Sequence, residues 1–303
     1  MADPPPGVQG DYPLARLTTI RTGGRAELFA RPGSLEELER LLAWAAGEGI
    51  EVGVVGSGSN LLVADAGVPG LVLKLDEELS TIEFDDTRIY CGAGARLPTV
   101  AARAAQVGLT GLEFGVSIPG TVGGAVRMNA NAYGGELARV LEWVDVATAS
   151  GTERRTPDEL GFRYRRSSLG PHEVVARACF ALERAEVGEV KATLADMRAR
   201  RRAAQPVGVK TFGSTFKNPP DAGGRTAGQL LDAACCRGLR VGGAGFSDKH
   251  ANFIVNHGDA TTADVIAVMA EGRRRVRERF GIDLEPEVQA LGPVELPPEW
   301  KAS

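Results

Sequence analysis

The sequence of 303 residues contains few cysteines and histidines. Its four cysteines form no C-x-x-C pair, and its three histidines show no H-x-x-x-H or similar ligand spacing. This scarcity argues against a zinc site and against a disulfide framework. We therefore expect no metal. We expect the cysteines, including the adjacent Cys235 and Cys236, to be small packing residues of a protein in a reducing compartment.

The sequence also lacks a strong charge, a long apolar run and a secretory leader. Its net charge is −4, so no general basic field would attract nucleic acid or an anionic membrane. Arginine clusters at 200–202 and 273–275 fall in predicted helices, where a solvated helix face is the expected role. The apolar runs are too short to cross a bilayer, and the start, MADPPPGVQGDYP, has no signal region. These absences predict a cytoplasmic protein without a nucleic-acid or membrane partner.

Two glycine-rich segments are the most unusual features that the sequence does contain. The first is the loop in VVGSGSNLLV, residues 54–63, which matches neither G-x-G-x-x-G nor the P-loop. The second, GVSIPGTVGGAVRMNANAYGG at 115–135, mixes glycine with many apolar residues. Glycine lets a backbone approach an anion closely, and two such loops predict a long ligand such as a dinucleotide. A plain tight turn and an empty Ω-loop are the alternatives.

Periodicity predicts a mixed α+β protein of three parts, residues 1–78, 79–206 and 207–303. The two glycine-rich segments lie in the first two parts, which would enclose the dinucleotide. Ser34 and Glu37 have capping-box spacing at the start of the first predicted helix. Residues 283–291, DLEPEVQAL, are predicted to form a strand. Helices are expected at 34–47, 97–107, 187–204, 226–235 and 261–280.

Seven motifs occur in a characteristic order: LTTIRTGG, GSGSNLL, IPGTVGGA, YRRS, GSTFKNP, SDKHANFIVN and LEPEV. Together they resemble the UDP-N-acetylenolpyruvoylglucosamine reductase family over nearly the whole chain. The resemblance implies a vanillyl-alcohol-oxidase type FAD-binding fold of two subdomains, followed by a C-terminal α+β substrate domain. It implies that NADPH reduces FAD, and that reduced FAD reduces the enolpyruvyl group of UDP-N-acetylglucosamine enolpyruvate. The product would be UDP-N-acetylmuramate, a peptidoglycan precursor. No histidine lies in either glycine loop, so FAD is expected to bind non-covalently.

The resemblance also implies three catalytic residues. Ser214 would donate a proton to the substrate α-carbon, Arg165 would stabilise the substrate carboxylate, and Glu287 would assist in a protonated or proton-sharing form. Arg165 is preferred to Arg163 and Arg166 because it follows Tyr164 in the family's pattern. In an extended segment Arg163 and Arg165 would share one face.

Two further sets of residues follow from the resemblance. The candidate cofactor-binding residues are Gly56, Ser57, Gly58, Ser59, Asn60, Leu61, Ser117, Pro119, Gly120, Thr121, Gly123, Gly124, Ala125 and Asn129. The candidate substrate-binding residues are Tyr164, Lys217, Asn218, Arg225, Lys249 and His250. Asn131 replaces a glycine common in the family, and we expect the loop to tolerate it because asparagine accepts left-handed backbone angles. The chain between Arg165 and Ser214 is short, which predicts the family's shorter form without a substrate-covering loop.

Two other functions remain open from the sequence. The chain could be an FAD-dependent sugar or alcohol oxidase with the same flavin fold, or a non-catalytic nucleotide-sugar binder. The presence of all three candidate catalytic residues in their motifs argues against the binder. The expected oligomeric state is a monomer or a small homo-oligomer.

Overall fold

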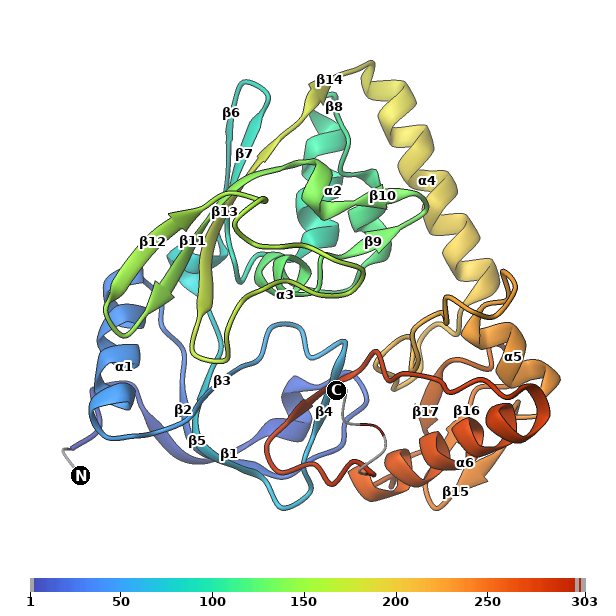
Figure 1. Ribbon diagram of the computed structural model, residues 1–303. Coiled ribbons are helices and arrows are strands. Elements are labelled where there is room, and N and C mark those ends of the chain that lie inside the picture. Colours follow the sequence, from blue (N-terminus) through green and yellow to red (C-terminus); the bar gives the residue numbers. More distant parts are fainter. Residues whose placement is uncertain (1–2, 298–299, 301–303) are drawn as a thin grey trace. The chain divides into compact units, whose positions relative to one another are not determined.

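The computed structural model describes residues 3–297 and 300 (Figure 1). The chain divides into two compact units. The first unit contains the residues up to Gly10, Glu27–Ser57 and Gly70–Arg201, and the second contains Asp11–Ala26, Gly58–Pro69 and the residues from Arg202 onward. The three-part division at residues 78 and 206 stays a prediction.

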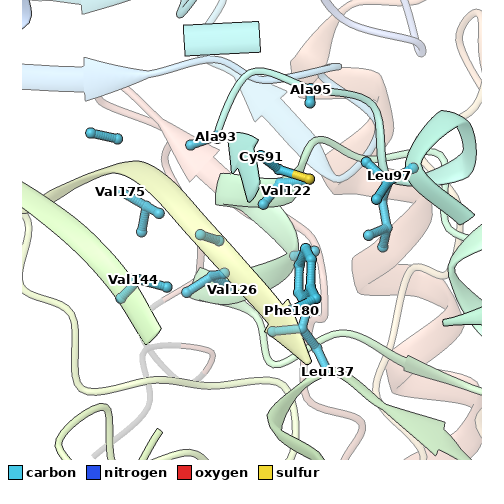
Figure 2. Packing of buried hydrophobic residues seen from close by; sticks show 14 of the residues in the cluster. Cys91, Ala93, Ala95, Leu97, Val122, Val126, Leu137, Val144, Val175 and Phe180 are labelled. Atoms are coloured by element: carbon cyan, nitrogen blue, oxygen red, sulfur yellow. The ribbon is translucent and has the colours of Figure 1, made fainter. Parts of the chain in front are cut away.

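A five-stranded antiparallel sheet organises the first unit. Its strands lie in the order β12 (Gly151–Arg155), β11 (Leu141–Thr148), β13 (Val174–Ala181), β7 (Arg88–Gly92) and β6 (Ile82–Asp85). The helix α3 (Val122–Arg127) packs against β13 and β7. Figure 2 shows this core, in which Val122 and Val126 of α3 lie near Val144, Val175 and Phe180 of the sheet. Val122 and Val126 of the second glycine-rich segment are therefore core residues of the first unit, whereas Tyr133 of the same segment is exposed.

Three other helices begin and end close to the predicted positions, whereas α3 was not predicted. They are α1 (Leu35–Gly47), α2 (Leu97–Gln106) and α4 (Val187–Ala204), the last of which runs across the unit boundary at Arg201. The Ser34 hydroxyl accepts the Glu37 N–H at 3.2 Å, as a capping box requires. The Glu37 carboxylate instead accepts the N–H of Gly33 at 2.9 Å. Only half of the predicted capping box is therefore right.

A four-stranded sheet contains three of the five points at which the chain passes from one unit to the other. Its order is β1 (Gln9–Pro13), β2 (Arg25–Ala30), β5 (Val68–Leu73) and β3 (Val52–Val54). The unit boundaries fall inside β1, β2 and β5. The shorter strands are β8 (Leu109–Thr110), β9 (Asn131–Ala132), β10 (Gly135–Glu136) and β14 (Glu183–Arg184).

The second unit is built on a three-stranded antiparallel sheet with two helices. The sheet consists of β15 (Arg240–Val241), β16 (Ala244–Phe246) and β17 (Ile254–Asn256), and α6 (Thr262–Phe280) contacts both β15 and β16. The helix α5 (Ala227–Ala233) packs on α6. The parallel pair β4 (Leu61–Val63) and β18 (Gln289–Leu291) completes the unit. Its core includes Phe212, Phe216 and Phe246.

Two predictions about local structure are wrong. Only Gln289–Leu291 of the predicted strand 283–291 is a strand, while Pro286 makes a single bridge to Phe216. Proline has no N–H to donate, so it does not continue a ladder. Cys235 is exposed rather than packed, although Cys91, Cys179 and Cys236 are buried, and all four are free thiols. Burial raises the pKa of the Cys91 thiol to about 12.

Among the described residues, no helix combines the length and the apolar composition that crossing a membrane would need. In the same part of the chain, no group of three or more His, Cys, Asp or Glu side chains is placed to hold a metal ion.

Candidate functional site

Three carbonyl groups of the first glycine loop accept hydrogen bonds from the protein, whereas its N–H groups donate to no acceptor in the described chain. In the first unit, the Lys74 ammonium donates to the Gly56 carbonyl at 2.8 Å. In the second unit, the Gly58 carbonyl accepts the Thr19 N–H at 3.0 Å, and the Asn60 carbonyl accepts the Gln289 N–H at 3.0 Å. Among the described residues, none of the backbone N–H groups of residues 56–60 donates to a protein acceptor. A row of N–H groups without protein acceptors is suited to an anion.

The second glycine loop contacts the first within the first unit. A Cβ atom added to Gly56 would lie less than 3.0 Å from Thr121 Oγ1 and 3.2 Å from Thr121 Cγ2. The N–H groups of Gly120 and Thr121 also find no protein acceptor in the described part of the chain. The Ser117 hydroxyl is buried and, among described residues, has no hydrogen-bond partner. Buried polar groups are normally paired, so these donors indicate a ligand position.

The glycines of these loops do not all serve the purpose expected from the sequence. Glycine is required at Gly58 because its φ is +60° and an added Cβ would collide with the Leu17 carbonyl. At Gly123 the N–H donates to the Ala93 carbonyl at 2.8 Å, and an added Cβ would meet Ala93 at 3.0 Å. Gly124 alone of these is exposed, with no atom closer than 3.5 Å to an added Cβ. The explanation that Gly56 and Gly58 leave room for a ligand is therefore wrong, because protein atoms occupy that space.

Lys74 adds positive charge beside the first loop and was missed from the sequence. Burial lowers the pKa of Lys74, and the nearby charges of Arg31 and Arg96 lower it further, against the opposing effect of Asp76. Its position in a buried strand end, within GLVLKL, was the available signal. Because the Lys74 ammonium bonds the Gly56 carbonyl, its positive charge lies beside the loop.

Two asparagines of the second loop behave differently from the prediction. Asn129 is buried with φ of +39°, and its side chain bonds the Glu136 carboxylate at 2.6 Å and the Ala138 N–H at 3.2 Å. Its amide therefore holds the loop itself. Asn131 lies in β9 opposite Glu136 and does not adopt a left-handed backbone. The left-handed backbone conformation occurs instead at Asn129.

Arg165 lies at the tip of a tight turn in the first unit. Arg163 and Arg166 exchange two backbone hydrogen bonds, at 3.0 and 3.1 Å, and Arg165 has φ of +57°. The extended geometry considered for this segment is thus wrong. Arg163 and Arg166 are exposed, whereas Arg165 is half-buried, and its guanidinium reaches the Asn131 carbonyl at 3.4 Å. Tyr164, the other residue at the tip, is exposed.

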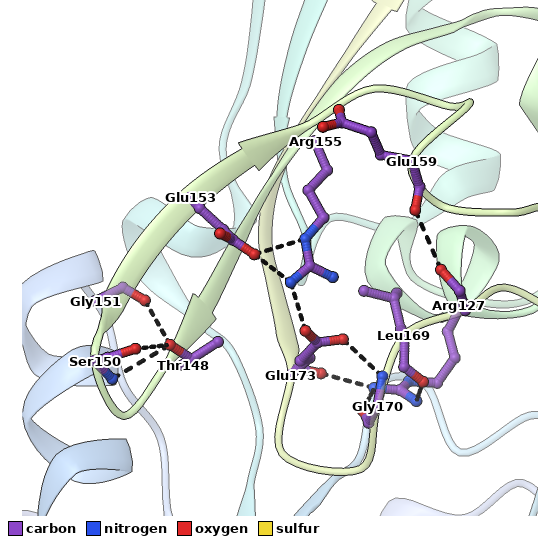
Figure 3. A network of polar contacts seen from close by, with 11 residues as sticks. Arg127, Thr148, Ser150, Gly151, Glu153, Arg155, Glu159, Leu169, Gly170 and Glu173 are labelled. Carbon is purple, nitrogen blue, oxygen red and sulfur yellow. Dashed lines mark hydrogen bonds and ion pairs between the residues drawn. The ribbon is translucent and has the colours of Figure 1, made fainter.

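A polar network anchors the long loop that carries Arg165 (Figure 3). The Arg127 guanidinium, at the end of α3, donates to the carbonyls of Gly170 and Glu173 at 3.1 and 2.7 Å. The Glu173 carboxylate accepts the Gly170 N–H at 2.7 Å and also binds Arg155 of β12. The Ser167 hydroxyl donates to the Arg127 carbonyl at 2.8 Å. Hydrogen bonds therefore join the loop that carries Arg165 to α3, which is itself part of the second glycine-rich segment.

Ser214 and Glu287 lie on neighbouring backbone segments of the second unit. The Glu287 N–H donates to the Thr215 carbonyl at 2.9 Å, and the Lys217 N–H donates to the Glu285 carbonyl at 2.9 Å. Both Ser214 and Glu287 are half-buried. Among the described residues, no group hydrogen-bonds the Ser214 hydroxyl. Arg165 belongs to the other unit.

The candidate substrate-binding residues of the second unit already have protein partners. Lys217 forms an ion pair with Glu285 at 2.6 Å, and the Asn218 side chain accepts the Ala227 N–H at 3.0 Å. Arg225 lies over the Phe280 ring at 4.8 Å, and the Lys249 ammonium donates to the Arg202 carbonyl at 2.6 Å.

His250 is half-buried against the Phe253 ring, and its Nδ1 accepts the Asn252 N–H at 3.2 Å. Burial and the charge of Arg237 lower the pKa of His250. Asn252 was also missed from the sequence, although it lies inside the SDKHANFIVN motif.

Comparisons with known proteins cover nearly the whole chain. A UDP-N-acetylenolpyruvoylglucosamine reductase of Acidiphilium cryptum is 44% identical over 283 residues, which is 93% of this chain and 90% of that protein. A reductase of the same name from Rubrobacter xylanophilus is 42% identical, with 95% and 96% of the two chains covered. The chain belongs to the UDP-N-acetylenolpyruvoylglucosamine reductase family.

Domain and structure matches agree with this family. Residues 26–157 of the reductase match the FAD binding domain, and residues 205–291 match the C-terminal domain of UDP-N-acetylenolpyruvoylglucosamine reductase. The crystal structure of the Thermus caldophilus enzyme of that name superposes with a TM-score of 0.82 at 39% identity. The match covers 94% of this chain and 98% of that one. The predicted family, the fold class and the FAD cofactor are confirmed, and the protein is a flavin-dependent reductase.

Proposed function

We propose that this reductase uses NADPH to reduce the enolpyruvyl group of UDP-N-acetylglucosamine enolpyruvate to UDP-N-acetylmuramate, for peptidoglycan synthesis. The observation that carries the proposal is the backbone pairing of residues 214–217 with 285–287, which brings two of the family's motifs together. The family's names and the order of its motifs support the same substrate. We also propose that it works in the cytoplasm, where nucleotide sugars are made, as a monomer or small homo-oligomer.

The residues of the first unit fit FAD. The N–H groups of Gly56, Ser57, Gly120 and Thr121 and the buried Ser117 hydroxyl are donors without protein acceptors in the described chain, and a diphosphate requires such donors. Bound FAD supplies the centre that accepts hydride from NADPH and passes it on. The other proposed contacts in the first unit are Pro119, Gly123, Gly124 and Ala125, and those in the second unit are Gly58, Ser59, Asn60 and Leu61. Asn129 contributes by holding its loop in place.

Three side chains serve the substrate in this proposal. Hydride addition to the β-carbon leaves negative charge at the α-carbon and its carboxylate. The Arg165 guanidinium binds that carboxylate because it is a planar cation that stays protonated. The Ser214 hydroxyl donates the proton to the α-carbon. Serine is a weak acid, so it must be held in contact with this strongly basic centre.

Glu287 assists at the same charge, and it does so as a proton donor or sharer, because a bare carboxylate would repel it. In this proposal the UDP group is bound by the exposed Tyr164 and by Lys217, Asn218, Arg225 and Lys249. The present partners of the last four residues are surface groups or backbone atoms. His250 supports the site indirectly, because its Nδ1 accepts the N–H of Asn252.

The chain between Arg165 and Ser214 is consistent with the shorter form of the family. Apart from loops, it consists of β13 of the five-stranded sheet, β14, which pairs with β8, and α4. The described chain has no further helix or strand there that could cover the substrate.

The decisive test measures the two half-reactions separately under anaerobic conditions. We expect Ser214→Ala to leave flavin reduction by NADPH within about twofold and to slow reoxidation by the enolpyruvyl sugar by at least about 100-fold, as loss of a proton donor does. Ser150 is a control outside the proposed site, because it lies in an exposed turn of the first unit, where its hydroxyl is hydrogen-bonded to the Thr148 hydroxyl at 3.0 Å. Ser150→Ala should change neither half-reaction.

Two outcomes would contradict the proposal. Equal slowing of both half-reactions by Ser214→Ala would remove the proton-donor role. A wild-type flavin that is reoxidised by oxygen but not by the enolpyruvyl sugar would favour the oxidase instead.

A further inference from the structure

The segment that carries Ser214 is held between two others in the second unit. On one side, Ser214 bridges to Phe253, and the Thr215 N–H donates to the Asn252 carbonyl at 2.8 Å. On the other side it is paired with residues 285–287. Before it, Gly213 has φ of +87°, and its N–H makes only a long 3.4 Å bond to Thr211 Oγ1. Gly213 is thus a weakly held link between the buried Phe212 and Ser214, so the residues that follow Ser214 contribute directly to its position.

The Asn252 side chain holds those following residues by a two-point bond. Its Oδ1 accepts the Phe216 N–H at 2.9 Å, and its Nδ2 donates to the Phe216 carbonyl at 2.9 Å. Asn252 is only 4% exposed and Phe216 only 1%, so no solvent replaces these bonds. A carboxamide presents one acceptor and one donor side by side, as a neighbouring strand would. The side chain thus substitutes for a strand where the chain turns at 250–253.

We propose that Asn252 is a positioning residue, which holds the Ser214 hydroxyl where it donates its proton to the substrate. This inference rests on the proposed function, because it assumes the role of Ser214. Without the carboxamide, the buried N–H and carbonyl of Phe216 lose their partners, and the segment shifts to find others. A displacement of about 1 Å at a reacting group costs on the order of 100-fold in rate.

The same motif provides a matched control in Asn256. Asn256 is 6% exposed, and its side chain also makes buried bonds, to the Ile20 carbonyl at 2.9 Å and from the Gly258 N–H at 2.8 Å. None of its side-chain bonds involves residues 213–217. Substitution at Asn256 therefore tests the loss of a buried asparagine without disturbing the Ser214 segment.

The experiment compares Asn252→Leu and Asn252→Asp with Asn256→Leu in the anaerobic half-reactions. Wild-type protein is measured first, and its reduction by NADPH and reoxidation by the enolpyruvyl sugar establish the proposed function independently. We expect both Asn252 variants to slow reoxidation at saturating sugar by about 10- to 100-fold. Flavin reduction by NADPH, and the KM for the sugar, should stay within about threefold. Asn256→Leu should lower stability but keep the reoxidation rate.

The carboxyl introduced by Asn252→Asp gives a further, chemical test. When protonated it has one acceptor oxygen and one O–H donor, the same pair as the carboxamide, and burial raises the pKa of such a group. Lowering the pH should therefore restore reoxidation in Asn252→Asp and not in Asn252→Leu. His250, the titratable group in contact with Asn252, is present in both variants, and so are Asp232 and Arg237, whose charges act on it. Any effect of these three groups on the reoxidation rate is therefore the same in both variants.

Several results would overturn the proposal. They are wild-type reoxidation rates in folded Asn252 variants, equal slowing by Asn256→Leu, equal slowing of both half-reactions, or no recovery of Asn252→Asp at low pH. If Asn252→Leu does not fold, Asn252→Ala replaces it, since it removes the same bonds without adding bulk. Reoxidation by Asn252→Ala at the wild-type rate would count equally against the positioning role.

Discussion

Gly56→Ala should destabilise the first unit through one contact, which makes its effect calculable. The added Cβ would lie less than 3.0 Å from Thr121 Oγ1, 3.2 Å from Cγ2 and 3.4 Å from Cβ. Thr121 would have to move, and its hydroxyl now caps α3 by accepting the Gly124 N–H at 3.4 Å. Overpacking costs about 1–3 kcal/mol, and loss of the cap adds about 1 kcal/mol. The free energy of unfolding should therefore fall by about 2–4 kcal/mol.

A double-mutant cycle with Thr121→Ala isolates that contact. Thr121→Ala alone should cost about 1 kcal/mol for the cap. In the double variant the added Cβ faces only Thr121 Cβ at 3.4 Å, an ordinary contact, so the double variant should cost little more than Thr121→Ala. The coupling energy should therefore nearly equal the whole cost of Gly56→Ala, about 2–4 kcal/mol, which is at the upper end of the range for residues in contact.

The cycle is measured by urea unfolding of the FAD-free protein, with the FAD dissociation constant of each variant determined in parallel. FAD affinity should fall in Gly56→Ala and recover in the double variant. If the two single effects simply added, the close approach of Gly56 to Thr121 would not be the reason for glycine at position 56.

Three further predictions concern other single positions. Gly124→Ala places a methyl group at an exposed helical position, so the free energy of unfolding of the FAD-free protein should rise by about 0.5–1 kcal/mol. FAD should bind more weakly to this variant, and an unchanged FAD dissociation constant would show that Gly124 is not part of the site. Thr215→Val should raise the Tm by a few degrees in calorimetry, because the buried Thr215 hydroxyl has no partner among the described residues; a lower Tm would reveal a missed one. Because the pKa of His250 is lowered below 6.5 in the folded chain, the unfolded chain binds the proton first, and stability should fall as the pH drops through 6.5 toward that folded value. His250→Gln should flatten this fall in urea midpoints, and an unaltered pH profile would contradict it.

Elements with strong local signals could be predicted from the sequence almost to the residue. Helix α6 begins after Thr261, whose hydroxyl accepts the Asp264 N–H at 3.0 Å, and it ends before Gly281, which has φ of +67°. Capping and left-handed termination depend on residues within one turn of the helix end, so the local sequence determines them. The N-terminal ends of α1 and α5 are set in the same way by Ser34 and Thr226.

The geometry around the candidate catalytic residues could not be predicted in this way. The turn at 163–166 depends on Arg165 adopting a left-handed backbone, which its residue type disfavours, and on anchoring by Arg127 from α3. The bond between Asn252 and Phe216 joins positions far apart in the chain, and the motif containing Asn252 shows only that an asparagine is present. Such contacts depend on the tertiary structure rather than on periodicity or propensity.

Glycine illustrates why a correct site can be predicted for the wrong physical reason. The loop at 56–60 was expected to bind a diphosphate because glycine leaves space for it, yet protein atoms occupy the space beside Gly56 and Gly58. What suits the loop to an anion is that its N–H groups have no acceptor in the described part of the chain, while the carbonyl groups of Gly56, Gly58 and Asn60 are bonded by Lys74, Thr19 and Gln289. The glycines allow the close packing that makes this arrangement possible. Substitutions at Gly56 and Gly58 should therefore impair folding before they impair binding, whereas Gly124 should respond in the opposite order.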